Sequence, residues 1–137
     1  MLILDLGKSR PVRTLSDARM ASAALAFSPD GSSLIAASFD GTLLVWDTGD
    51  RARQLEGVPA AIALALSPDG ALAAVARASF NPPDAPAEVR LVDLRSGKTR
   101  ANRALGIAHH VAVAFPQPGR LRIASSRATS IEVQTPD

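Results

Sequence analysis

The sequence predicts an all-β protein built from repeated antiparallel sheets, and three observations support this fold class. A turn of sequence Ser-Pro-Asp-Gly occurs at residues 28–31 and again at 67–70, each after a bulky apolar residue. A degenerate copy that includes this apolar residue, Phe-Pro-Gln-Pro-Gly, occupies residues 115–119. Before each turn, larger and smaller apolar residues alternate with period two, which is typical of strands. Both faces of these strands are apolar, which predicts that both faces are buried.

Each repeated turn is expected to join two strands. Proline presets φ, aspartate bonds its own backbone, and glycine takes the left-handed position that follows. The first strands are expected at residues 22–27, 61–66 and 111–115, and the second strands at residues 34–38, 72–76 and 121–125. Bulky residues occupy one face of the first strands and small residues the other. Sheets stacked face to face would therefore set a bulky face on the small face of a neighbour.

Third strands are expected in every repeated unit, and fourth strands in all but the last. Asp40-Gly41 predicts a two-residue hairpin turn into a third strand. The third strands are expected at residues 42–47, 89–93 and 131–134, with a partial copy at 1–5, and the fourth strands near 12–15, 52–55 and 99–104. The chain, 1–137, is thus expected to hold trailing strands of a preceding unit (1–16), a complete unit (21–58), a second with a long loop at 77–87 (60–106), and an incomplete third (110–134).

The segment that runs from Ser-Pro-Asp-Gly at 28–31 to Asp-Gly-Thr-Leu-Leu-Val-Trp-Asp at 40–47 resembles the WD repeat, one unit of a β-propeller blade. The resemblance covers nearly the whole chain, as three degenerate units and a leading strand. It implies antiparallel four-stranded blades, about three of them, in a partial ring. Ser-Pro-Asp-Gly turns also occur in lactonases and in Tol-type propellers, whereas the Trp-Asp ending is of the WD style.

The resemblance also implies a structural role for three polar residues. In the family, a histidine before the first strand, a serine or threonine in the second, an aspartate in the next turn and the tryptophan form a hydrogen-bonded tetrad. Ser38, Asp40 and Trp46 match this pattern, but no histidine lies between Leu15 and Phe27. The tetrad is therefore expected to be incomplete, and the three residues are interpreted as structural.

Three units are too few for a closed propeller, because propellers typically have four to eight blades. Each blade buries its faces on two neighbours, so an isolated arc has two open faces. We therefore expect other protein to complete the ring, either identical copies of this chain or other blades of a larger protein. The leading strand at 1–5 would be surplus in a ring of identical copies, which favours a fragment.

Composition excludes several classes of protein. Hydrophobic residues make up 47% and charged residues 20%, as in globular proteins. There is no cysteine, and the longest apolar run, 60–66, is far shorter than the roughly 20 residues of a membrane span. No secretory signal is visible, so a cytoplasmic location is expected. The arginines are spread over several predicted strands without interleaved aromatics, which disfavours nucleic-acid binding.

The candidate partner-binding residues lie on two loops. From the turn glycine to the aspartate that ends the third strand, the second unit spans 23 residues, against 16 in the first. The extra residues fall within 77–87, where Phe80 beside a rigid proline pair is a candidate anchor; the alternative is a tolerated insertion with Phe80 folded onto its own blade. His109 and His110 precede a first strand on the same side, and the alternative for them is a structural or solvated role. The candidates are Arg77, Phe80, Asn81, Pro82, Pro83, Asp84, His109 and His110.

No catalytic motif is present. The sequence contains no G-x-S-x-G elbow, no H-E-x-x-H pair and no phosphate-binding loop, so no enzyme activity, cofactor or metal is expected. The resemblance implies a non-catalytic protein–protein interaction scaffold or sensor module, and for this arginine-rich chain a bacterial setting. The alternative is part of an enzyme or carrier propeller of the lactonase or Tol type with a site at the ring centre. The largely alanine first strands disfavour such a site within these three units.

Overall fold

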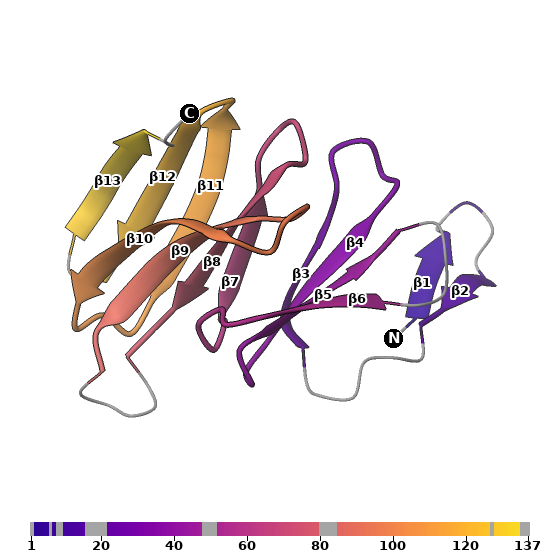
Figure 1. The fold of residues 1–137 in the computed structure, drawn as a ribbon, viewed down its shortest axis with the longest axis horizontal. Helices are drawn as coiled ribbons and strands as arrows, with labels where there is room; N and C mark the ends of the chain where they lie inside the picture. Colours follow the sequence, from indigo (N-terminus) through magenta and orange to yellow (C-terminus); the bar gives the residue numbers. More distant parts are fainter. Residues whose placement is uncertain are drawn as a thin grey trace.

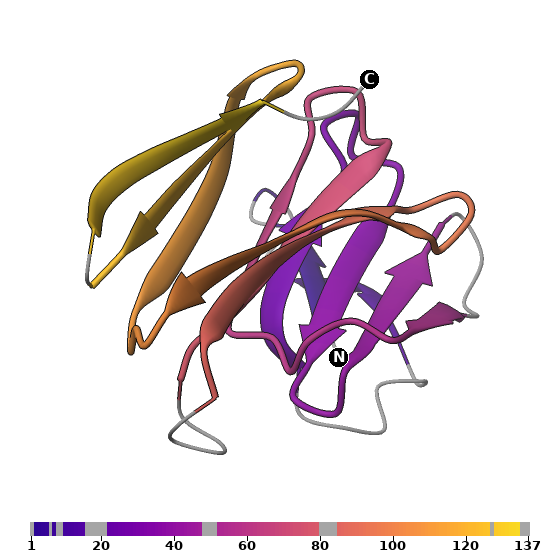
Figure 2. The same ribbon diagram turned by 60° about the vertical axis from the view of Figure 1, so that its left-hand side comes forward.

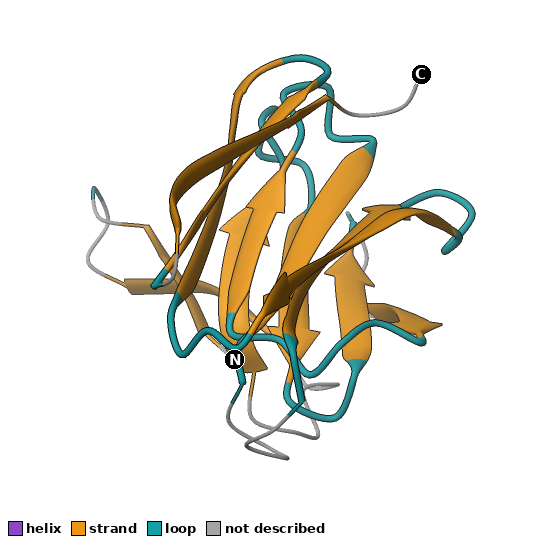
Figure 3. Ribbon diagram, turned by 90° about the vertical axis from the view of Figure 1, so that its left-hand side faces the viewer, coloured by secondary structure: helices purple, strands orange, loops and turns teal. Residues whose placement is uncertain are grey.

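The computed structural model describes residues 2–5, 7, 10–15, 22–47, 52–79, 85–126 and 128–134, and within these ranges it contains strands and turns but no helix (Figure 3). None of the described residues belongs to a helix that could cross a membrane. The strands are β1 (Leu2–Asp5), β2 (Arg10–Thr14), β3 (Ser22–Phe27), β4 (Leu34–Ser38), β5 (Thr42–Trp46), β6 (Ala52–Glu56), β7 (Ala63–Leu66), β8 (Leu72–Arg77), β9 (Ala87–Asp93), β10 (Thr99–Gly106), β11 (Val111–Gln117), β12 (Arg120–Ser125) and β13 (Ala128–Gln134).

These strands form one hairpin and three antiparallel sheets arranged as a fan (Figure 1). The N-terminal hairpin is β1–β2, the first sheet is β3–β6, the second is β7–β10, and the third is the three-stranded β11–β13. The second sheet stands between the other two, with β7 next to both β3 and β11 (Figure 2). The fan does not close, so the predicted all-β partial propeller is confirmed.

The sheets pack by setting bulky residues on small ones, as the sequence predicts. Leu64 and Leu66 of β7 pack in one cluster with Ala24 of the first sheet. Val113 and Phe115 of β11 likewise pack against alanines of the second sheet. Each bulky face thus points toward the preceding sheet and each small face toward the following one.

The prediction that both faces of every first strand are buried is wrong at the two ends of the fan. On β3, Leu25 is 53% and Phe27 56% exposed, although both belong to its bulky face. The N-terminal hairpin covers this side of the first sheet over Leu34, Leu44 and Trp46 on the second and third strands. The two strands of this hairpin that the structure describes leave β3 uncovered. The small face of β11 is exposed for the corresponding reason, because no other sheet of the described residues packs against that face.

The repeated turns explain where each first strand ends and each second strand begins. Asp30 Oδ1 accepts hydrogen bonds from the Ser28 and Ser32 hydroxyls at 2.6 and 2.8 Å, and from the Ser32 amide at 3.0 Å. The degenerate copy folds differently, because proline (Pro118) replaces the aspartate. There β11 continues to Gln117, which pairs with Arg120 around a two-residue turn.

Candidate partner-binding face

The connections between strands gather on two opposite edges of the fan. The turns that join β3 to β4, β7 to β8 and β11 to β12 lie along the upper edge in Figure 1. The connections that join β4 to β5, β8 to β9 and β12 to β13, together with those that lead from one sheet to the next, lie along the lower edge, which we call the loop edge. The described part of the loop edge comprises residues 39–41, 57–62, 78–79, 85–86, 107–110 and 126.

The turn between β4 and β5 displays a phenylalanine on a fixed backbone. Phe39 is 58% exposed, the largest exposure among the bulky apolar side chains in the described part of the chain. The Asp40 carboxylate accepts from the Thr42 amide at 3.1 Å and from its hydroxyl at 2.7 Å. Gly41 has φ +83°, and a Cβ there would lie 2.8 Å from the Val58 carbonyl oxygen, so glycine alone fits. The Val58 amide in turn donates to the Gly41 carbonyl at 3.3 Å.

Segment 57–62 joins the first and second sheets through backbone hydrogen bonds. The Ala61 amide donates to the Ser38 carbonyl at the end of β4, at 3.1 Å. The Ile62 amide donates to the Ala76 carbonyl of β8, at 2.8 Å. This segment is therefore bound to a strand of each sheet, and it holds the Phe39 turn beside it.

Segment 107–110 joins the second and third sheets in a similar way. The Ser79 amide donates to the Ala108 carbonyl at 2.8 Å, and the Ser79 hydroxyl accepts from the Ala108 amide at 3.1 Å. The Ser126 hydroxyl accepts from the His109 amide at 3.1 Å, and the Ser126 amide donates to the His110 carbonyl at 3.0 Å. The backbone of both histidines is thus fixed by the third sheet.

The histidine side chains lie on the loop edge, as expected for a partner surface, and both residues are exposed. His110 also borders an open hollow of about 560 Å³ between Ile62 and the start of the third sheet. No group of three side chains suited to a metal ion occurs among the described residues. The structure thus places both histidines on the exposed loop edge.

Arg77, at the base of the long loop, is engaged within the fold. The Arg77 guanidinium donates to the Pro86 carbonyl at 2.9 Å and lies 3.7 Å from the Glu88 carboxylate, so it spans the base of the loop. Phe80, Asn81, Pro82, Pro83 and Asp84 lie outside the described residues.

Two exposed apolar residues of the loop edge were not predicted from the sequence. Phe39 lies between the last residue of β4 and the Asp40-Gly41 turn, and Ile107, 38% exposed, follows β10. Both lie just outside the period-two alternation of the strands. A bulky apolar residue directly before an Asp-Gly turn belongs to neither face of the sheet. The exposure of Phe39 could have been predicted from this position.

The structure does not bring Ser38, Asp40 and Trp46 together into a hydrogen-bonded group. Trp46 pairs with Leu34, so it lies four residues, about 13 Å, along β4 from Ser38. The Ser38 hydroxyl and the Trp46 indole nitrogen are buried, and neither has a hydrogen-bond partner. The Asp40 carboxylate bonds within its own turn instead. Burial in the apolar cluster with Leu34 accounts for the position of Trp46.

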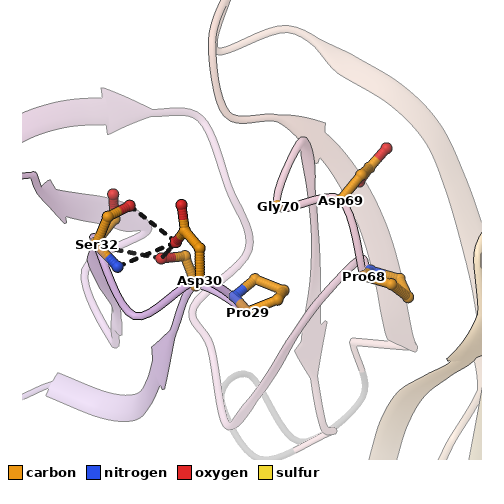
Figure 4. Close-up of a pocket in the computed structure, with 8 residues that line it drawn as sticks. Pro29, Asp30, Ser32, Pro68, Asp69 and Gly70 are labelled. Atoms are coloured by element: carbon orange, nitrogen blue, oxygen red, sulfur yellow. Dashed lines mark hydrogen bonds between the residues drawn. The ribbon is translucent and has the colours of Figure 1, made fainter.

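A hollow of about 180 Å³ on the opposite edge is the space left where two turns pack together. It lies between the two Ser-Pro-Asp-Gly turns, where Pro29 and Asp30 face Pro68, Asp69 and Gly70 (Figure 4). Hydrogen bonds from Ser28 and Ser32 lower the pKa of Asp30 to about 2. Bonds from the Ser67 hydroxyl and the Ala71 amide lower the pKa of Asp69. Both carboxylates thus accept hydrogen bonds from their own turns.

Comparison with known proteins identifies the repeat and the fold. Residues 9–47 match the family model for "WD domain, G-beta repeat", which confirms the resemblance to WD repeats. No curated protein matches the chain.

Similar solved structures include WD40 propellers. The RRP9 WD40 repeats superpose with a TM-score of 0.72 at 18% identity, over 89% of this chain and 38% of that one. For the Cps50 (Swd1) β-propeller domain of Myceliophteria thermophila the TM-score is 0.73 at 21% identity, over 92% and 38%. U3-55K gives 0.70 at 19% identity, over 89% and 38%. The chain therefore spans 38% of the length of these structures and shares their fold.

Proposed function

We propose that this chain, which carries a WD repeat and the fold of WD40 propellers, is a non-catalytic scaffold or sensor module that binds a protein partner at its loop edge. The observation that carries this proposal is Phe39, 58% exposed on a turn that three hydrogen bonds and a glycine hold in place. Aromatic anchors supply much of the affinity of protein interfaces. A fixed backbone lowers the ordering cost of binding.

The surrounding residues fit a protein partner. Ile107, His109 and His110 add apolar and polar contacts on the same edge. We include Phe80, Asn81, Pro82, Pro83 and Asp84 in this surface because their loop joins β8 to β9 there.

Several arginines are engaged in ways that argue against a nucleic-acid partner. Arg53 donates to the Leu94 carbonyl at 2.5 Å, Arg90 donates to the Gly57 carbonyl, and Arg100 pairs with Asp93 at 2.5 Å. Arg53 and Arg90 thus help to hold the first sheet to the second, and Arg100 bonds within the second sheet. Phosphates would have to compete with these carbonyl and carboxylate acceptors.

We also propose that the propeller ring is completed by other protein, either identical copies or other blades. The support is the exposed bulky face of β3, where Leu25 and Phe27 occupy the positions that Leu64 and Leu66 fill in the packed interface. Exposed apolar faces of this kind mark interaction surfaces.

The experiment uses this chain as bait for proteins of its own cells, with Phe39→Ser as the test variant. The serine should reduce capture of the partner at least tenfold, on the order of a single hot-spot residue. The melting temperature should hardly change, because the side chain is largely exposed.

Phe27→Ser is the matched control, since Phe27 is 56% exposed on the open face of β3 and away from the loop edge. Proteins retained by wild type and Phe27→Ser but lost from Phe39→Ser are the predicted partners. Equal capture by wild type and Phe39→Ser would contradict the loop-edge proposal, whereas proteins lost from Phe27→Ser alone would be those that complete the ring on the open face of β3.

A further inference from the structure

The N-terminal hairpin stands at one end of the fan and covers only part of the first sheet (Figure 1). Ile3 of β1 packs in one cluster with Leu34 of β4 and Trp46 of β5. Phe27 of β3 pairs with Leu34 across the sheet, yet Phe27 is 56% and Leu25 53% exposed. The uncovered surface therefore continues the interface that the hairpin already makes with this sheet.

The strand β1 has an open edge beside this surface. Among the described residues, β1 pairs with β2 and with no other strand. The third strands of the two complete sheets pair on both edges, β5 with β4 and β6, and β9 with β8 and β10. One edge of β1 thus carries unpaired amide and carbonyl groups, to which a further strand can add. A two-stranded hairpin is also only marginally stable without more strands.

The two packed interfaces show which strands cover the equivalent bulky residues. In both, the bulky residues of a first strand pack in one cluster with two alanines that pair across the first and second strands of the preceding sheet. These sets are Ala24 and Ala37 with Leu64 and Leu66, and Ala63 and Ala76 with Val113 and Phe115. The surface left open on β3 is therefore the surface that a first and a second strand would cover.

A second copy of this chain has no free hairpin to place there. In each of the three sheets the second strand is already paired on both edges: β4 with β3 and β5, β8 with β7 and β9, and β12 with β11 and β13. None of these strands can pair with β1 unless its own sheet comes apart. The missing strands must therefore come from a blade other than the three sheets described.

We infer that the open face of β3 is covered by a β-hairpin of another blade, whose second strand pairs antiparallel with β1 and whose small side chains contact Leu25 and Phe27. This inference rests on the ring completion proposed above and specifies it on one side. The strands β1 and β2 are the outer half of a four-stranded sheet, and the docking hairpin is its inner half.

The test supplies such a hairpin on the chain itself. A second copy of residues 22–41 is fused ahead of residue 1, so that the Asp40-Gly41 turn of the copy leads into β1. This order of strands along the chain is that of the two complete sheets. Native-state exchange should show that the β1 amides that point away from β2 exchange about tenfold more slowly or better, the scale of burying one large apolar side chain. The urea midpoint should rise as well.

Two variants of the fused chain serve as controls. Ala37→Glu in the fused copy alone sets a carboxylate in the apolar contact and should abolish the gain in protection. Phe27→Ser in the resident β3 alone should reduce the gain, because one of the two exposed bulky side chains is then missing.

Three results would overturn the inference. The first is a fused chain whose β1 amides exchange as fast as in wild type, and the second is equal protection in the Ala37→Glu control. The third is a discrete two-copy assembly of the wild type that Phe27→Ser disrupts. The capture experiment with Phe27→Ser tests ring completion separately, so failure here would leave that proposal standing. None of these readouts involves Phe39 and the loop-edge function.

Discussion

Two buried serines show how the same side chain has opposite consequences at two positions. Ser38 and Ser79 are both 1% exposed. The Ser79 hydroxyl accepts the Ala108 amide at 3.1 Å and helps join the second sheet to the third. The Ser38 hydroxyl has no partner. A buried polar group without a hydrogen bond costs free energy, whereas one that satisfies a buried amide spares that cost.

Substituting each serine by alanine should therefore change the free energy of unfolding in opposite directions. Ser79→Ala leaves the buried Ala108 amide without its side-chain acceptor and should lower stability by about 1–3 kcal/mol. Ser38→Ala removes an unsatisfied hydroxyl and should leave stability unchanged or raise it by up to about 1 kcal/mol. Urea denaturation measures both, and each variant is the control for the other. Equal losses would show that the Ser38 hydroxyl has a partner after all.

At the scale of single elements, the two Ser-Pro-Asp-Gly turns are stabilised by ionised carboxylates. The pKa of Asp30 is lowered to about 2 from an ordinary value of 3.8, chiefly by the Ser28 hydroxyl. The pKa of Asp69 is lowered chiefly by the Ser67 hydroxyl, which donates at 2.5 Å. The turn between β9 and β10 follows the same chemistry, since the Ser96 amide and Arg100 hold the pKa of Asp93 well below its usual range.

These depressed pKa values predict a loss of stability in acid. A carboxyl group with a lower pKa in the folded state contributes fully above its unfolded pKa, and the contribution is lost as pH falls through the folded value. For Asp30 this window runs from about pH 4 down to about pH 2. Denaturant titrations across this window should show a shallower pH dependence for the Asp30→Ala, Asp69→Ala double variant than for wild type. Pro118→Ala, at the equivalent place in the third turn, is the control and should keep the wild-type slope, because neither side chain ionises. An unchanged slope in the double variant would contradict the account.

The predicted elements were those fixed by local chemistry. Period-two alternation and turn residues act within a few positions of the chain, so the strands from β3 to β12 lie where the sequence places them. β7 begins two residues later than expected, because the amides of Ala61 and Ile62 bond to the first and second sheets. The loop edge was less predictable, because contacts such as Ser79 with Ala108 join residues far apart in the sequence. Ser38 and Trp46 were linked by motif, but the strand register separates them.

At the scale of the whole molecule, the fan places its three sheets in unequal surroundings. The second sheet packs on both faces, against the first sheet through Leu64 and Leu66 and against the third through Val113 and Phe115. All four residues 73–76 of β8 are 0% exposed. The third sheet packs on one face and leaves Ala112, Ala114 and Arg122 exposed. In repeat proteins, stability is approximately the sum of each unit and its contacts with its neighbours.

This difference predicts a gradient of local stability along the fan. Native-state amide exchange should find the slowest amides in β8 and β9, because opening them disrupts two interfaces. The amides of β12 should exchange through a smaller opening that disrupts one interface. Phe115→Ala, which removes a contact between the second and third sheets, should speed exchange in β12 more than in β4, while Leu64→Ala at the other interface should do the reverse. Equal protection of β4, β8 and β12, with both variants accelerating all three alike, would instead show that the open fan unfolds as a single cooperative unit.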